Sequence, residues 1–199
     1  MTRAINAAGL AIVKANEGLR LTAYRDIAGI ETIGYGHTPA TPGQQITPAQ
    51  AGALLSADLA WAEDTVAAAA RSATDNQFSA MVSLTFNVGP AAFRSSSVLR
   101  LHLAGDFSAA ADAFLEWDKA HVNGALIESA GLLRRRGEEK ALYLTPDAAP
   151  VAPVTRQPDI MAIIRQLQVA LSTAGFYTGA VDGICGPLTI AAIRAAQAG

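Results

Sequence analysis

The chain has little cysteine, little charge and few aromatic residues. Cys185 is the single cysteine among 199 residues, so the chain can form no internal disulfide and no cage of several thiolates around a metal ion. Charged residues make up 16% of the chain and sum to a formal charge of −2. This balance excludes a strongly basic nucleic-acid-binding protein, and we expect no nucleic-acid partner.

Long apolar runs are also missing. No stretch approaches the ~18 apolar residues that a membrane-spanning helix needs, so we expect no stable insertion into a membrane. The short apolar run at the N-terminus is interrupted by Asn6, Lys14 and Asn16. We interpret it as an amphipathic helix and not as a signal peptide.

The chain is rich in hydrophobic residues, which make up 51%, and about a fifth of it is alanine, which favours helices. Ile5, Ile12 and Val13 fall on one helical stripe and predict a first helix at residues 3–16, ended by Gly18. From 21 to 37, β-branched and aromatic residues alternate with glycines, which predicts a small β-hairpin.

The middle of the chain is predicted to be helical. Thr47 to Gln50 and Thr74 to Gln77 each have the pattern of a capping box, the first with Pro48 after the cap. The predicted helices cover 48–70, 75–88, 95–104, 107–119 and 129–143. One hairpin among helices predicts an α+β domain that is mainly α, at residues 1–144.

The segment at 145–158 holds four of the nine prolines and is predicted to be an extended linker. The remaining residues, 159–199, predict a second and much smaller domain, with helices at 159–173 and 188–197 around a glycine-punctuated loop.

Two acidic residues and a hydroxyl near the predicted hairpin are the best candidates for catalysis. Glu17 ends the first helix, where the partial negative charge of the helix C-terminus disfavours ionisation and suits a proton donor. Asp26, on the polar hairpin, suits a carboxylate that assists water, with Thr32 orienting that water. The spacing alone is also compatible with surface ion pairs to Arg20 or Arg25.

The string EGLRLTAYRDIAGIETIGYGHT at 17–38 closely resembles the signature of the phage-type lysozymes, glycoside hydrolase family 24. The family motif is Glu, eight residues, Asp, five residues, Thr, and Glu17, Asp26 and Thr32 match it. The resemblance continues to residue 144 and implies a lysozyme-like fold. It also implies hydrolysis of the β-1,4 bond between N-acetylmuramic acid and N-acetylglucosamine, with Glu17 as general acid and Asp26 and Thr32 assisting water.

Two further residues are candidates for substrate binding. Phe93 is a core residue by default, with a sugar contact as the alternative. Among the three arginines at 134–136, Arg135 or Arg136 is expected to pair with Glu17, as a basic residue does in relatives, and Arg135 is the candidate substrate contact. Phe86 and Trp117 are expected in the core.

The three histidines are interpreted as structural. His37 is expected to pack in the hairpin, and His102 and His121 have no partners at the spacing of metal ligands. Asn87 is expected to hydrogen-bond at a helix end. The sequence therefore predicts no metal and no cofactor.

The segment at 163–197 is similar to the peptidoglycan-binding module, a three-helix unit found on many wall-degrading enzymes. Within it, Asp182 is expected to bond to loop amides and Thr189 to cap or stabilise the last helix. Cys185 is expected to be a small buried side chain, and Ala196 stands where the module usually has phenylalanine.

Together these features predict a monomeric endolysin, a muramidase whose partner is bacterial peptidoglycan. It would be made in the cytoplasm of the host bacterium and would act on the periplasmic wall once a separate holin opens the membrane. Two alternatives stay open: a lytic transglycosylase that cleaves the same bond, and a non-catalytic wall-binding protein.

Overall fold

The computed structural model describes residues 3–26, 28–122, 125–147 and 160–198, and for 121–122 the backbone alone. The chain forms two compact units, Met1–Asp147 and Ala148–Gly199, which are described separately below. The fold is mainly helical with small two-stranded sheets, as predicted.

The first helix, α1, spans Ala7–Glu17 and begins later than predicted. Asn6 caps it, because its Oδ1 accepts a hydrogen bond from the backbone N–H of Gly9 at 2.9 Å, so residues 3–6 lie outside the helix. Gly18 ends the helix as predicted, with a φ of 73° that favours glycine.

The predicted hairpin is confirmed. Strands β1 (Arg20–Arg25) and β2 (Glu31–Gly34) pair antiparallel, with Tyr24 opposite Thr32. Because Glu17 lies three residues before β1, the catalytic candidates all fall on one continuous segment formed by the end of α1 and the hairpin.

Both predicted capping boxes are present. Helix α2 (Pro48–Ala69) begins at Thr47, and α3 (Asp75–Val88) begins at Thr74. In each box the threonine hydroxyl accepts from a backbone N–H in the first turn, and a glutamine side chain three residues later accepts from the N–H of the cap residue.

The segment after α3 differs from the prediction. Four helical segments follow, namely α4 (Pro90–Arg94), α5 (Ser97–Leu103), α6 (Phe107–Ala113) and a 3₁₀ turn (Phe114–Trp117). The helix expected at 107–119 thus ends in a 3₁₀ turn at Trp117. It is followed by a second hairpin, β3 (Lys119–Val122) and β4 (Ala125–Glu128), so the expectation of a single hairpin was wrong.

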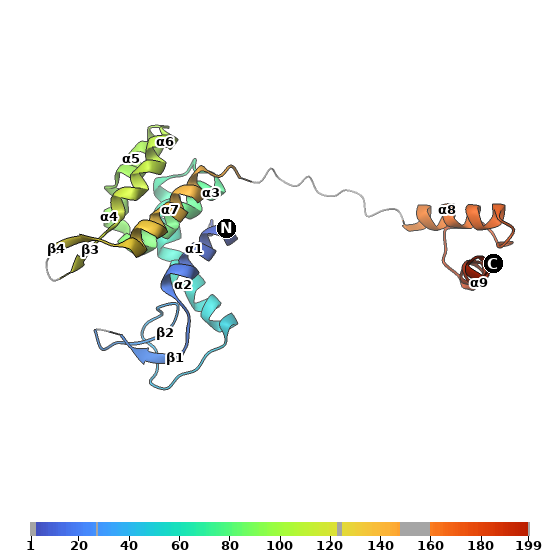
Figure 1. Cartoon of the computed structure of the whole chain (residues 1–199), viewed down its shortest axis with the longest axis horizontal. Helices are drawn as coiled ribbons and strands as arrows, with labels where there is room; N and C mark the ends of the chain where they lie inside the picture. The colour runs from blue at the N-terminus through green and yellow to red at the C-terminus, as the bar shows by residue number, and fades with distance from the viewer. Residues whose placement is uncertain (1–2, 27, 123–124, 148–159, 199) are drawn as a thin grey trace. The chain divides into compact units, whose positions relative to one another are not determined.

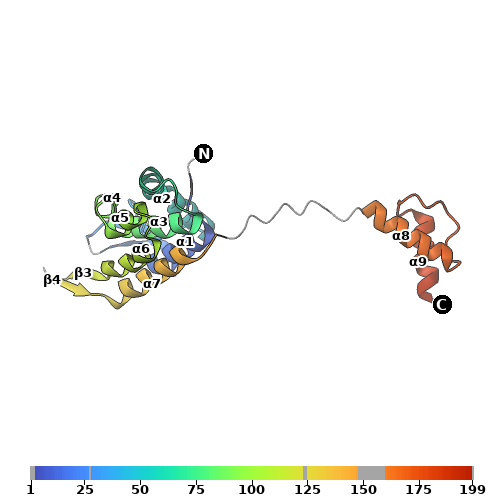
Figure 2. The ribbon, with the colours of Figure 1, turned by 90° about the horizontal axis from the view of Figure 1, so that it is seen from above.

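Helix α3 is the centre of the first unit. Every residue from Gln77 to Thr85 is buried, because α7 (Ala130–Leu144), α2 and α1 all pack against it (Figure 1). Phe78, Leu84 and Phe114 are fully buried in the core that these helices share. Figure 2 shows the β3–β4 hairpin leading directly into α7, so that this hairpin is anchored at the N-terminal end of α7.

Residues 145–147 belong to the first unit and not to the linker. The carboxylate of Asp147 accepts hydrogen bonds from the backbone N–H groups of Asp75 and Asn76, at 2.6 and 2.8 Å. These bonds hold the chain against the N-terminus of α3 and keep the pKa of Asp147 below its ordinary value. The rest of the predicted linker, 148–158, lies outside the described residues.

The described part of the second unit contains two helices, α8 (Ile160–Thr173) and α9 (Pro187–Ala198), where the resemblance implied three. Leu171, Tyr177 and Ala192 form its small core, with Ala196 packed against them. A glycine-rich loop connects the two helices, and Gly175 and Gly183 in this loop have positive φ angles.

Hydrogen bonds around buried Gln168 organise this unit. Its side-chain Nε2 lies within 3.1 Å of oxygens of Tyr177, Asp182, Ile184 and Thr189, and its Oε1 accepts from the N–H of Gly183. Asp182 also accepts from the N–H of Ile184, and these loop hydrogen bonds lower its pKa. The expected role of Asp182 in the loop is therefore confirmed.

Two other residues of this unit can be compared with expectation. Thr189 is buried, and its hydroxyl donates to the carbonyl of Ile184, so it secures the loop to the start of α9. Cys185 is exposed, so the prediction of a buried thiol was wrong. It lies in a turn closed by a hydrogen bond from the N–H of Gly186 to the carbonyl of Ile184, outside the small core.

Candidate active site

Glu17 is the last residue of α1, and its carboxyl is held from another helix. Arg135 of α7 donates from Nη1 to Oε1 of Glu17 at 2.8 Å, which confirms one of the two pairings expected for this glutamate. The Glu17 side chain is 27% exposed, whereas that of Arg135 is 4% exposed. The acid is therefore accessible, and the cation that positions it is buried.

The preceding residue provides a second link between α1 and α7. Asn16 donates from Nδ2 to Glu138 at 3.1 Å and accepts at Oδ1 from Arg134 at the same distance. Arg134 and Glu138 also pair with each other, one turn apart. Two adjacent residues thus fix the end of α1 to α7, which restricts the position of the Glu17 backbone.

Asp26 directly follows β1 and shapes the hairpin turn. Its Oδ1 accepts hydrogen bonds from the N–H groups of Ala28 and Ile30, at 2.8 and 2.9 Å, while its own N–H donates to the carbonyl of Ile30. One carboxylate oxygen is therefore engaged by the turn. Within the described residues, no hydrogen bond uses Oδ2.

Thr32 lies on β2, opposite Tyr24, and is 4% exposed. Its hydroxyl donates to the carbonyl of Ile30 at 3.1 Å, so Asp26 and Thr32 both bond to the same residue at one end of the hairpin. In the described part of the chain, no hydrogen bond or ion pair joins Glu17 to either of them. The structure thus brings Asp26 and Thr32 together and places Glu17 separately, against α7.

The two candidate substrate contacts are both buried. Phe93 has no exposed surface and lies in the hydrophobic core, which confirms its default assignment, and the alternative of a sugar contact finds no exposed ring surface. Arg135 is 3% exposed and uses its guanidinium on Glu17, on Glu139 and on the carbonyl of Ser83. Its observed partners are therefore Glu17 and two buried groups.

A buried ionic cluster lies behind this pair. Glu139 is fully buried, with Arg135 Nε 3.2 Å from its Oε1 and Arg136 Nε 3.1 Å from its Oε2. The hydroxyl of Ser83 donates to Oε1 at 2.6 Å. Burial raises the pKa of Glu139 against the opposing influence of both arginines and Ser83, and burial lowers the pKa of Arg136.

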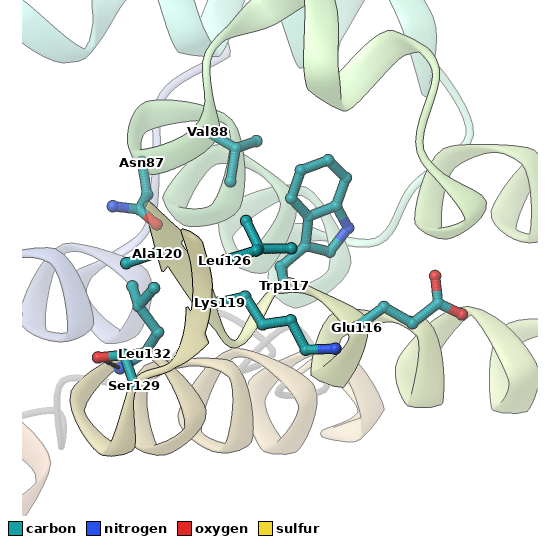
Figure 3. A pocket seen from close by; sticks show the side chains of 9 residues that line it. All are labelled: Asn87, Val88, Glu116, Trp117, Lys119, Ala120, Leu126, Ser129 and Leu132. Carbon is teal, nitrogen blue, oxygen red and sulfur yellow. Dashed lines mark hydrogen bonds between the residues drawn. The ribbon is translucent and has the colours of Figure 1, made fainter. Parts of the chain in front are cut away.

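A pocket of about 660 Å³ lies where α3 ends, between the 3₁₀ turn, the second hairpin and the start of α7 (Figure 3). Asn87 lines it, and its Oδ1 accepts from Nη2 of Arg136 at 3.0 Å rather than bonding at the helix end. The other lining residues are Val88, Glu116, Trp117, Lys119, Ala120, Leu126, Ser129 and Leu132.

None of the three catalytic candidates lines this pocket, and the pocket was not predicted from the sequence. Trp117, expected in the core, is part of its wall while still packing against core residues. The Asn-Gly pair at 123–124 was the signal that could have revealed it, because this dipeptide between strand-forming residues is typical of a hairpin.

The histidines have structural partners where they are described. His37 lies 3.0 Å from the carboxylate of Asp58 on α2 and so connects the hairpin to that helix. His102 is buried and bonds through Nδ1 to the hydroxyl of Tyr143 at 2.7 Å, and burial lowers its pKa. The side chain of His121 lies outside the described residues. Within those residues, no group of three histidine, cysteine, aspartate or glutamate side chains could hold a metal ion.

Comparison with known proteins identifies the family of the chain. The family model described as phage lysozyme matches residues 14–139, which include Glu17, Asp26 and Thr32. The chain belongs to the phage lysozyme family. Members of this family cleave peptidoglycan, and residues 161–198 of this family member match a peptidoglycan binding domain.

Its curated relatives are named endolysins. The phage lysozyme family member is 43% identical over 141 residues to the endolysin of Acyrthosiphon pisum secondary endosymbiont phage 1, covering 70% of this chain and 97% of the relative. It is 41% identical over 148 residues to the endolysin of Salmonella phage P22, and the match covers 71% of this chain and 98% of that endolysin.

Solved structures show the same fold. The muramidase domain of SpmX from Asticaccaulis excentricus is 42% identical with a TM-score of 0.67, covering 71% of this chain and 98% of that one. A mutant of the P22 lysozyme is also 42% identical, with a TM-score of 0.64, and the match covers 71% of this chain and 99% of the lysozyme chain. Among the described residues of this phage lysozyme family member, no helix is both long and apolar enough to cross a membrane.

Proposed function

We propose that this protein is an endolysin of the muramidase type, hydrolysing the β-1,4 bond between N-acetylmuramic acid and N-acetylglucosamine in peptidoglycan. The observation that carries the proposal is the accessible carboxyl of Glu17 at the end of α1, held at 2.8 Å by buried Arg135. Glycoside hydrolysis requires a proton donor of fixed orientation beside the leaving oxygen. In the proposal, Glu17 is that donor.

Asp26 and Thr32 are assigned to the water molecule. Two turn amides hold Oδ1 of Asp26, which orients the carboxylate and keeps Oδ2 for a water proton. Since the Thr32 hydroxyl donates its proton to Ile30, its lone pairs are the part that can accept from the same water. This division of roles favours hydrolysis over a transglycosylase, which needs no activated water.

The test separates an enzyme from a wall-binding protein. Glu17→Gln keeps the shape of the side chain but removes the proton donor, so it should abolish clearing of a cell-wall suspension while the protein still sediments with the walls. Asp112→Asn is the matched control, because Asp112 is an exposed carboxylate on α6 that pairs only with Lys140 in the described structure. Equal clearing by wild type and Glu17→Gln would reject the proposal.

We also propose that residues 159–199 bind the wall as a separate domain, joined to the first unit, which ends at Asp147, by the linker at 148–158. The match of residues 161–198 to a peptidoglycan binding domain supports this role. Because the net charge of −2 gives little electrostatic attraction to anionic walls, a second binding site would raise the local concentration of the catalytic unit.

For its biology, we propose a monomer made in the cytoplasm of a host bacterium, which reaches the wall after a separate holin opens the membrane. The endolysin names of its phage relatives support this route. Expression in bacteria should then cause lysis only when the inner membrane is also permeabilised. Lysis by the intact protein without any membrane lesion would contradict the holin requirement.

A further inference from the structure

Glu139 is a charged residue in a place where charge is costly. Its side chain has no exposed surface, and burial of a carboxylate is unfavourable unless partners compensate for the lost water. Ser83 Oγ at 2.6 Å and Arg135 Nε at 3.2 Å donate hydrogen bonds to its Oε1, and Arg136 Nε forms an ion pair with its Oε2 at 3.1 Å. An apolar residue would fill the same space without this cost, so stability alone does not account for a glutamate here.

The first branch of the cluster leads to Glu17. The guanidinium of Arg135 donates from three nitrogens to three fixed points, namely Nη1 to Glu17, Nε to Glu139 and Nη2 to the carbonyl of Ser83. Two of these three anchors lie on the buried side. They fix the plane of the guanidinium, and that plane determines where Nη1 meets the carboxyl of Glu17.

The second branch leads to the pocket. Arg136, with no exposed surface, faces Glu139 through Nε and donates from Nη2 to Asn87, which lines the 660 Å³ pocket. One buried carboxylate is therefore shared by the arginine that holds Glu17 and the arginine that holds a pocket residue.

We propose that Glu139 is a positioning residue for the reaction. It fixes Glu17 through Arg135 and the pocket wall through Arg136 and Asn87, so that the proton donor and the pocket keep a constant geometry. This role rests on the proposed function for the reaction it serves. The positioning itself can be measured in the resting protein.

The first measurement is independent of activity. In ¹⁵N-labelled full-length protein, the Nε–H of Arg135 is predicted to exchange slowly with water, because it is buried and bonded to Glu139. Glu139→Gln removes the charge while keeping the side-chain shape. It should release Arg135, so that its Nε–H exchanges much faster, whereas Asp112→Asn should leave that signal unchanged.

The second measurement is kinetic. Glu139→Gln should lower kcat on purified peptidoglycan by on the order of tenfold to a hundredfold, because a misplaced catalytic group loses that much rate. KM should change by less than about threefold if only transition-state interactions are affected. Ser83→Ala removes one hydrogen bond to Glu139 without changing charge, and should lower kcat by about fivefold.

Three outcomes decide the proposal. Faster exchange at Arg135 together with lower kcat supports it. A folded Glu139→Gln protein with unchanged exchange and unchanged kcat overturns it, and if that variant fails to fold, Ser83→Ala provides the same decision. If the wild type itself releases no products, the proposed function fails. The exchange measurement then still decides whether Glu139 fixes Arg135.

Discussion

Arg135 and Glu17 lie 2.8 Å apart, on two helices separated by more than a hundred residues of sequence, and Arg135 is the buried partner. The pair makes the orientation of the exposed carboxyl depend on the interior of the protein. Arg135→Lys tests this dependence, since lysine keeps the charge but cannot donate to Glu17, Glu139 and Ser83 in one plane.

We expect Arg135→Lys to lower kcat by on the order of tenfold or more while the protein stays folded and bound to walls. Peptidoglycan digestion gives the rate, and circular dichroism checks the fold. A folded variant with wild-type kcat would show that the reaction does not require the three hydrogen bonds of the Arg135 guanidinium.

Phe93 should matter for stability and not for sugar binding. Its ring is fully buried, so Phe93→Ala should lower the free energy of unfolding by about 3–5 kcal/mol. Phe107 is 46% exposed and is the matched control, for which alanine should cost about 1 kcal/mol or less. Urea unfolding measures both, and a stable Phe93→Ala protein with weakened substrate binding would restore the sugar-contact hypothesis.

His102 should make stability depend on pH. Burial lowers its pKa, so in mildly acidic solution the unfolded chain takes up a proton that the folded chain does not. The stabilisation is complete above the ordinary histidine pKa of about 6.5 and is lost as pH falls toward the lower folded value. The difference between the free energies of unfolding at pH 7.5 and at pH 5.5 should therefore be larger in the wild type than in His102→Asn. Equal differences in the two proteins would disprove the assignment.

Gln168 should determine wall binding through the fold of the second unit. Gln168→Ala leaves the buried N–H of Gly183 without its partner, at a cost of about 1–3 kcal/mol, and removes one hydrogen bond to Asp182. In so small a core that loss should unfold the unit. Sedimentation with walls should decrease while cleavage of soluble fragments continues, and exposed Gln166→Ala should change neither. Normal sedimentation of Gln168→Ala would place wall binding elsewhere.

Local signals in the sequence predicted local structure well. The capping boxes at Thr47 and Thr74 and the stop at Gly18 depend on hydrogen bonds and backbone angles within a few residues, and all three are confirmed. The second hairpin has such a signal in Asn-Gly at 123–124, but the prediction assigned no structure to residues 120–128, between two predicted helices.

Other features depend on packing between distant segments. The pattern of α7 presents three consecutive arginines, and nothing local indicates that Arg135 and Arg136 are buried while Arg134 is exposed. Glu139 is buried because α3 packs against α7, and Ser83 of α3 donates a hydrogen bond to the Glu139 carboxylate. Glu17, Asp26 and Thr32 were identified through family resemblance, since their spacing alone also fits surface ion pairs.

The most direct test of the proposed reaction is the chemistry of its products. Purified peptidoglycan is digested with the wild type and with Glu17→Gln, reduced with borohydride and analysed by mass spectrometry. Hydrolysis with Glu17 as the acid predicts reducible muramic acid ends from the wild type and none from the variant. Anhydromuramic ends, or equal release by both proteins, would contradict it.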